Sequence, residues 1–287
     1  MVLFTACSAP PSVDSAEGQT PLVAGVKIYK DVAYGRHQKQ GMDIYAPENA
    51  ENAPVVMMLH GGSWAWGDKA EAAAYVNKVN RWVPKGFIII SVDTRLLPEA
   101  DVYKQIDDLA HAVAKAQELA TDWGGDPSRF ILMGHSSAGT LVSVLAAKPS
   151  LVTDLGGRRW LASISLDASI LDAPRSLSLW PIKMFTDAYG LEADHWPAGS
   201  AIDMLTNDSI PLCLICSTQR RDNTCEQSQM YAAQAKKFNV ATTIIQSNDD
   251  HGAVNTQLGL SNAYTANVEA FMATLDRDVA SRLGTEI

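Results

Sequence analysis

The sequence lacks several features, and each absence narrows what the protein can be. It has no run of 18 apolar residues, which excludes a membrane-spanning helix. It has no cluster of Lys and Arg, and its net charge is −9, so nucleic acid and anionic membrane surfaces are poor partners. It also has no internal repeat and no low-complexity linker, so residues 23–287 are expected to form one domain.

Cysteine is scarce, with four residues in a chain of 287. Cys213 and Cys216 have CxxC spacing, but they lie in an apolar run of strand character. Residues three apart on a strand face opposite sides, so a metal or redox pair is not expected there. Cys216 and Cys225 could form a disulfide in an oxidising compartment, or could remain buried thiols, and both alternatives stay open. No metal site and no cofactor are expected.

Residues 1–22 are expected to form a flexible lead. A short apolar run ends at Thr5, Ala6 and Cys7, and a polar, proline-containing tether follows. This order is typical of the end of a bacterial lipoprotein signal, although Phe4 and the missing basic front segment are atypical. It predicts a lipid anchor at Cys7 and a periplasmic or membrane-anchored protein. The alternative is a tail without targeting meaning, on a cytoplasmic protein.

Apolar runs of strand length alternate with helical patterns through the rest of the chain. Strands are predicted at 26–34, 42–45, 54–60, 87–93, 130–134, 161–167, 211–216 and 241–246. Helices are predicted at 69–83, 102–121, 141–147, 226–238 and 266–275. Alternating strands and helices build crossovers, so we expect an α/β fold with a mostly parallel sheet and helices on both faces. The first two strands have no helix between them and should form an antiparallel hairpin.

The strongest local pattern is a tight strand-to-helix turn at Gly134 and Ser136. Such a turn lifts the serine hydroxyl above the sheet, and the helix N-terminus beneath it favours developing negative charge. Glycine is usual at position 138, where Ala138 stands, so Ser137 is kept as the rival nucleophile. A phosphate-binding loop is not expected, because Thr140 stands where such a loop needs lysine.

A second pattern lies earlier in the chain, where His60, Gly61 and Gly62 follow a buried strand. The backbone N–H groups of such a loop, together with the N–H of the residue after the nucleophile, can bind the oxyanion of an acyl transfer. We therefore predict the N–H groups of Gly62, Ser63 and Ser137 as oxyanion donors. A plain turn is the alternative for the loop.

A serine nucleophile needs a base, and the base needs an acid that orients it. In this kind of site the acid and then the histidine follow the serine along the chain. His251 lies just after the last predicted strand, whereas His195 lies in an insert that contains Trp and Pro, so His251 is the predicted base. Asp222 is the only carboxylate between the seventh strand and the next helix, and it is the predicted acid. Glu226 and Asp172 are the substitutes.

Together these patterns resemble the bacterial esterase/lipase branch of the α/β-hydrolases, which includes carboxylesterases and feruloyl-esterase-like and acetyl-xylan-esterase-like proteins. The resemblance covers nearly everything after residue 25 and rests on residues 60–69, 93–98, 123–127, 134–136 and 250–252. It implies an α/β-hydrolase fold with a mostly parallel eight-stranded sheet. It also implies a small cap insert at about 168–209 and a triad of Ser136, Asp222 and His251, without metal.

The same resemblance implies hydrolysis of a short-chain or aromatic carboxylic ester through an acyl-enzyme on Ser136. Trp64 and Trp66 flank the oxyanion loop and are predicted to line the substrate pocket, which favours an aryl or sugar ester. The expected partner is a small-molecule ester. An amidase or formamidase on the same fold, and a non-catalytic binding protein, are the alternatives. The sequence leaves the oligomeric state open.

Overall fold

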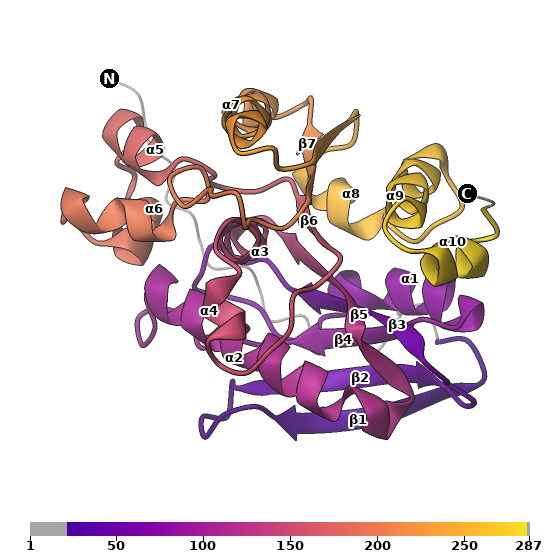
Figure 1. The fold of residues 1–287 in the computed structure, drawn as a ribbon. Helices are drawn as coiled ribbons and strands as arrows, with labels where there is room; N and C mark the ends of the chain where they lie inside the picture. Colours follow the sequence, from indigo (N-terminus) through magenta and orange to yellow (C-terminus); the bar gives the residue numbers. More distant parts are fainter. Residues whose placement is uncertain (1–21, 286–287) are drawn as a thin grey trace.

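A computed structural model describes residues 22–285, so the predicted lipidation site at Cys7 lies outside the described residues. An eight-stranded sheet forms the centre of the molecule, in the order β1-β2-β4-β3-β5-β6-β7-β8 (Figure 1). The strands are β1 (Val26–Ala33), β2 (Gly41–Pro47), β3 (Ala53–Leu59), β4 (Ile88–Val92), β5 (Gly125–His135), β6 (Ala162–Leu166), β7 (Leu212–Ser217) and β8 (Thr242–Ser247).

The pairing of these strands confirms the predicted sheet. β1 pairs antiparallel with β2, as the predicted hairpin requires, and β2 pairs antiparallel with β4. All other neighbouring strands are parallel. Strands β3, β4, β6 and β7 are buried along their whole length, because helices cover both faces of a parallel sheet.

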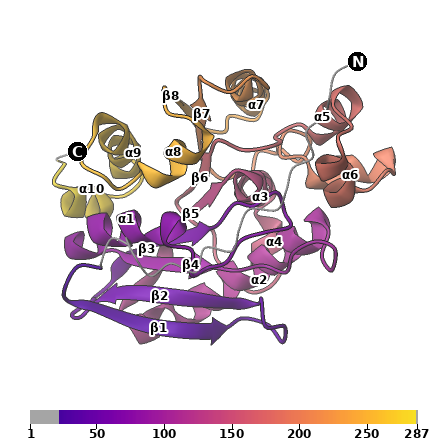
Figure 2. The ribbon, with the colours of Figure 1, turned by 180° about the vertical axis from the view of Figure 1, so that it is seen from behind.

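Helices pack on both faces of the sheet through two separate apolar clusters. One face carries α2 (Val102–Leu119), α3 (Ser137–Ala147) and α7 (Thr224–Lys237). The other face carries α1 (Ala72–Trp82), α8 (His251–Thr256), α9 (Ala263–Ala273) and α10 (Arg277–Leu283). Figure 2 shows α9 and α10 on the opposite side of β3 and β5 from α2 and α4 (Ser150–Thr153).

α8 and α10 are two of the five α-helices within residues 22–285 that were not predicted from the sequence, together with α4 and the two α-helices of the insert. α8 has 6 residues and α10 has 7, so neither completes the two turns that make a helical period visible in a sequence. The helix predicted as the last one begins at Ala263 and is followed by α10. Among residues 22–285, no helix combines the length and the apolar character needed to cross a membrane.

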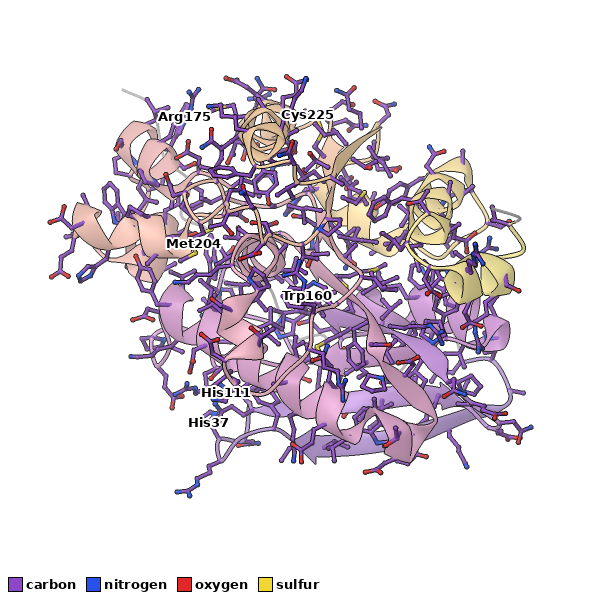
Figure 3. The ribbon with its side chains drawn as sticks, viewed as in Figure 1. His37, His111, Trp160, Arg175, Met204 and Cys225 are labelled. Carbon is purple, nitrogen blue, oxygen red and sulfur yellow. A yellow bond between two sulfur atoms is a disulfide. The ribbon has the colours of Figure 1, made fainter. Side chains whose placement is uncertain are left out.

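The predicted insert contains three short helices, α5 (Ala173–Leu179), α6 (Lys183–Tyr189) and η3 (Ala193–Gly199). α5 lies next to α7, and an ion pair between Arg175 and Glu226 (3.2 Å) joins the two helices. Figure 3 shows Arg175 and Cys225 at the same end of the molecule. The insert therefore stands beside the carboxyl end of β7, where the next connection begins.

Of the two alternatives left open for cysteine, the structure contains the disulfide between Cys216 and Cys225 (Cα–Cα 5.1 Å). It ties the end of β7 to the first turn of α7 and closes the loop of residues 217–224 between them. Within residues 22–285, Cys213 is a buried free thiol. The loop closed by the disulfide contains the predicted acid, Asp222, so its geometry bears directly on the site.

Candidate active site

Ser136 occupies a strained turn between β5 and α3. Its φ is 58° and its ψ −120°, in a region that residues other than glycine seldom adopt and that functional sites often retain. The turn is tight enough that a Cβ on Gly134 would lie 2.3 Å from the carbonyl oxygen of Ala138. Ala138 itself is 1% exposed in the core, so its methyl group is accommodated where glycine is usual.

The hydroxyl of Ser136 lies within hydrogen-bond distance of an imidazole. His251 Nε2 is 2.9 Å from Ser136 Oγ, and His251 Nδ1 is 2.6 Å from Asp167 Oδ2. The serine follows β5, the aspartate follows β6, and the histidine begins α8, whose N-cap is Asp250. Because β5 and β6 are parallel neighbours, their carboxyl ends bring the first two residues to the same edge of the sheet.

The structure corrects the predicted acid, because His251 contacts Asp167 and not Asp222. β6 and β7 are parallel neighbours, so the residues after either strand can reach the histidine. The space after β7 is taken by Arg220, whose guanidinium binds Asp222 in a two-pronged pair. The substitutes are engaged elsewhere: Glu226 pairs with Arg175, and Asp172 caps α5.

Asp167 is fully buried and its carboxylate is well supplied with donors. Oδ1 accepts from the N–H of Ser217 (2.9 Å) and from Thr224 Oγ1 (2.8 Å), while Oδ2 faces His251 and Arg220. Burial by itself raises the pKa of this carboxyl. The hydrogen bonds from His251 and Ser217, the charge of Arg220 and the hydrogen bond from Thr224 outweigh burial and lower the pKa to about 2. Asp167 is therefore ionised at neutral pH.

His135 precedes Ser136, and its ring contacts His251. Its Nε2 lies 2.8 Å from the carbonyl oxygen of His251, and the two rings lie 4.6 Å apart, centroid to centroid. Burial and the neighbouring His251 lower the pKa of His135 to about 4. A neutral ring at this position donates to the carbonyl and fixes where α8 begins.

The loop predicted to hold the oxyanion packs directly against the turn at Ser136. A Cβ on Gly61 would lie 3.0 Å from the carbonyl oxygen of His135 and 3.1 Å from Ser136 Cβ, so a larger residue would require these neighbours to shift by a few tenths of an ångström. Gly62 and Ser63 continue the loop with φ of 128° and 55°. They line the same cavity as Ser136.

One hydrogen bond and one helix terminus position the predicted oxyanion donors. His60 Nε2 lies 3.0 Å from Asp93 Oδ1, which anchors the start of the loop to the residue that follows β4. Ser137 is the first residue of α3, and a helix leaves the N–H groups of its first turn without intrahelical partners. The predicted donor groups therefore come from two elements that meet at Ser136.

Two cavities lie near Ser136. We call the first, of about 350 Å³, the loop-side cavity; it is lined by Ser136, His251, Gly62, Ser63, Trp66, Glu71 and Asn255, among others. The second, of about 340 Å³, is the cap-side cavity, with an apolar wall of Leu179, Trp180, Ile182 and Phe185 from the insert. Ser136 does not line the cap-side cavity, but Ser169 does, and Ser169 Oγ lies 3.3 Å from Ser136 Oγ. Sequence reasoning missed Ser169, which no motif marks.

The structure separates the two tryptophans that were predicted to line the pocket. Trp66 is 68% exposed and lines the loop-side cavity, as predicted. Trp64 is 1% exposed, and its ring makes edge contacts with Phe185 and Tyr189 of α6, so its predicted place in the pocket was wrong. Its backbone turns at a φ of 62°, which directs the ring into the core instead of the cavity.

These positions give opposite expectations for two matched substitutions. Trp64→Ala removes a fully buried ring and should lower the free energy of unfolding by about 3–5 kcal/mol. Trp66→Ala removes an exposed ring and should change that free energy by less than about 1 kcal/mol, while it raises KM for an ester. Urea unfolding curves and initial rates measure both effects. Equal destabilisation by the two substitutions would contradict the assignment.

A known family and several known proteins resemble this chain in sequence. The model of the BD-FAE family matches residues 42–257. Carboxylesterase NlhH of Mycobacterium tuberculosis is 36% identical over 115 residues, which are 39% of this chain and 34% of that protein. The probable isoprenylcysteine alpha-carbonyl methylesterase ICMEL2 of Arabidopsis thaliana is 28% identical over 153 residues, 53% of this chain and 34% of that one. The chain thus spans about one third of the length of these curated relatives.

Solved structures resemble this fold over most of its length. A truncated form of a carbohydrate esterase from gut microbiota has a TM-score of 0.71 at 17% identity, with 93% of this chain and 100% of that chain covered. Esterase B from Lactobacillus rhamnosis has a TM-score of 0.69 at 20% identity, with 91% and 89% covered. At this level of identity the likeness establishes the α/β-hydrolase fold, which confirms the predicted fold class.

Proposed function

Because this chain belongs to the BD-FAE family and has the α/β-hydrolase fold, we propose that it is a serine hydrolase that cleaves carboxylic esters. One observation carries the proposal: Ser136, His251 and Asp167 form an unbroken hydrogen-bond chain, with distances of 2.9 and 2.6 Å. A serine, a histidine and an aspartate in this order are the arrangement that activates a hydroxyl for acyl transfer. The carboxylesterase and methylesterase names of its relatives support the same reaction class.

In the proposed reaction, Oγ of Ser136 attacks the ester carbonyl while Nε2 of His251 takes the hydroxyl proton. Asp167 holds the Nδ1 proton and stabilises the imidazolium that forms. The N–H groups of Gly62, Ser63 and Ser137 bind the oxyanion, each worth roughly 100- to 1000-fold in rate. His251 then protonates the departing alcohol. A water molecule that gives its proton to His251 attacks the acyl-enzyme, and the acid is released.

The two cavities supply room for the two halves of an ester. Ser136 lines the loop-side cavity and its neighbour Ser169 lines the cap-side cavity, and each cavity presents an exposed tryptophan, Trp66 at the loop side and Trp180 at the cap side. We assign the insert of residues 168–209 the role of a cap, because Leu179, Trp180 and Ile182 form an apolar wall of the second cavity. Tryptophans beside polar and charged side chains suit an aryl or sugar ester of small size.

Export of the protein is a further part of the proposal. A disulfide such as that between Cys216 and Cys225 persists in an oxidising compartment and is rare in the cytosol. This supports a periplasmic location, and it agrees with a lipid anchor at Cys7.

A panel of substrates tests the proposed reaction. We expect the protein to hydrolyse p-nitrophenyl esters of short acyl chains, with the rate falling as the acyl chain outgrows a cavity of about 350 Å³. The matching p-nitroanilides should react at least 100-fold more slowly, since an amide needs more stabilisation of its leaving group. A faster rate on anilides or on formyl amides would point to an amidase. No turnover of any member would favour a binding protein.

A further inference from the structure

Arg220 has no part in the proposed reaction, yet it touches the histidine and the aspartate of the site. It lies in the loop closed by the disulfide, and its side chain is 17% exposed. One nitrogen, Nη1, lies 3.2 Å from Asp167 Oδ2, 3.1 Å from the carbonyl oxygen of Asp167 and 3.2 Å from His251 Nδ1. The same nitrogen therefore contacts both the aspartate and the histidine of the site.

The hydrogens around His251 Nδ1 can be assigned from the distances. A neutral imidazole that accepts the serine proton at Nε2 carries its own hydrogen on Nδ1. Asp167 Oδ2, at 2.6 Å, receives that hydrogen. The N–H groups of Arg220 therefore donate to the oxygens of Asp167, and at Nδ1 the guanidinium acts only through its charge.

The other side of Arg220 is held just as firmly. Nε lies 2.8 Å from Asp222 Oδ1, and Nη2 contacts Asp222 Oδ2. Asp222 lines the cap-side cavity, and the disulfide between Cys216 and Cys225 fixes both ends of the loop. A planar guanidinium can bridge two carboxylates at fixed angles, which a lysine ammonium cannot do. Arg220 is thus a rigid link between the cavity wall and Asp167.

The contact has two consequences for Asp167. The charge of Arg220 favours the ionised carboxylate and is one of the causes that lower the pKa of Asp167 to about 2. The donation from Nη1 to Oδ2 fixes the orientation of the carboxylate, and that orientation sets the tautomer of His251.

Other titratable groups surround the pair without contacting it in the same way. His135 packs on the His251 ring and is held neutral by burial, and Lys78 is buried against Asn255 with its pKa lowered to about 7 by burial. Tyr264 of α9 lies near Asp167, and the Asp249 carboxylate accepts a hydrogen bond from Ser247 Oγ. Within residues 22–285, Arg220 is the cation in direct contact with Asp167.

We propose that Arg220 is a positioning residue that holds the carboxylate of Asp167 in the orientation that receives the Nδ1 hydrogen of His251. The proposal rests on the proposed function, because it assigns Arg220 a role in the same Ser136 reaction. It also assigns the loop of residues 217–224 its purpose, which is to carry this charge and not the acid.

The test compares R220Q with R220K and with R159Q, which removes an exposed arginine that bonds only the carbonyl of Asp208. In R220Q, kcat at pH 8 should fall about tenfold while KM stays within about twofold, because the orientation of Asp167 matters for proton transfer and not for ester binding. R220K restores the charge and one contact with Asp167, so kcat should recover in part, but a lysine cannot bridge both carboxylates. R159Q should match the parent protein.

The result that would overturn the proposal is an unchanged kcat in R220Q, or a loss that appears in KM instead of kcat, as expected for an arginine that only shapes the cavity wall. A second readout does not need turnover. In the S136A background, NMR should show the hydrogen-bonded Nδ1 proton of His251, and this signal should broaden or disappear when R220Q is added. If the parent protein hydrolyses no ester, the proposed function fails, and this Nδ1 signal still decides the role of Arg220.

Discussion

Replacement of Ser136 by alanine is expected to lower kcat on p-nitrophenyl acetate by roughly 10⁴- to 10⁶-fold, to near the uncatalysed rate. The substitution removes the hydroxyl that lies 2.9 Å from His251 Nε2, so no acyl-enzyme can form on this residue. Ser136 is 8% exposed and its side chain does not cap α3, so the fold should persist. Initial rates and a thermal unfolding curve measure the two effects separately.

Ser137→Ala is the matched control for that experiment. It removes the neighbouring hydroxyl, the rival nucleophile, and leaves the backbone N–H that we assign to the oxyanion. We expect it to retain activity within about tenfold of the parent protein. A collapse of activity in Ser137→Ala, with Ser136→Ala still active, would move the nucleophile by one position.

Asp167→Asn is expected to lower kcat by about 10³- to 10⁴-fold. An amide has a single acceptor oxygen and no charge, so it cannot receive the Nδ1 hydrogen of His251 and also bind Arg220 as the carboxylate does. The serine–histidine contact remains, so binding of the ester should change little, and the loss should appear in kcat and not in KM. The variant keeps the shape of the side chain. Stopped-flow or steady-state rates at pH 8 give both constants.

Asp222→Asn is the control that separates the two candidate acids. Its carboxylate contacts Arg220 and not His251, so we expect a loss of less than about tenfold, through a looser Arg220. If Asp222→Asn proved as damaging as Asp167→Asn, Asp222 would be the functional acid, as predicted from the sequence, and the contact of His251 with Asp167 would not be the one that matters in catalysis.

The sequence was sufficient to predict the parts of the fold that depend on local pattern. All eight strands were predicted, because buried parallel strands are continuous apolar runs. The turn at Ser136 and the base His251 were also placed correctly relative to each other, since a nucleophile after one strand and a histidine after the last must meet at the same edge of a parallel sheet.

The acid could not be settled in that way. Asp167 and Asp222 follow neighbouring parallel strands, and local pattern does not say which of two adjacent strand ends faces the histidine. Arg220 pairs locally with Asp222, and the deciding interactions are the tertiary contacts of Asp167 with His251 and Arg220. A signal was available, because Asp167 stands directly after a buried strand. The acid was instead predicted after the seventh strand, which is its more common position in this fold.

Trp64 shows the same limit on the scale of one residue. Trp64 and Trp66 both flank the glycine loop, but positive φ at Ser63 and Trp64 turns one ring into the core and the other to the surface. Both residues are tryptophans beside the same loop, so the sequence does not distinguish them, and only the path of the backbone does. Ser169 was missed for a related reason, since its proximity to Ser136 arises from a fold-back after β6.

The identity of the residue that a fluorophosphonate probe modifies tests the proposed chemistry without any assumption about the natural ester. The probe reacts with a serine only where a base has activated it. After labelling and digestion, mass spectrometry should find one adduct, on Ser136, and none in His251→Ala. An adduct on another residue, or a parent protein that resists the probe, would contradict the assignment of Ser136, His251 and Asp167 as a working triad.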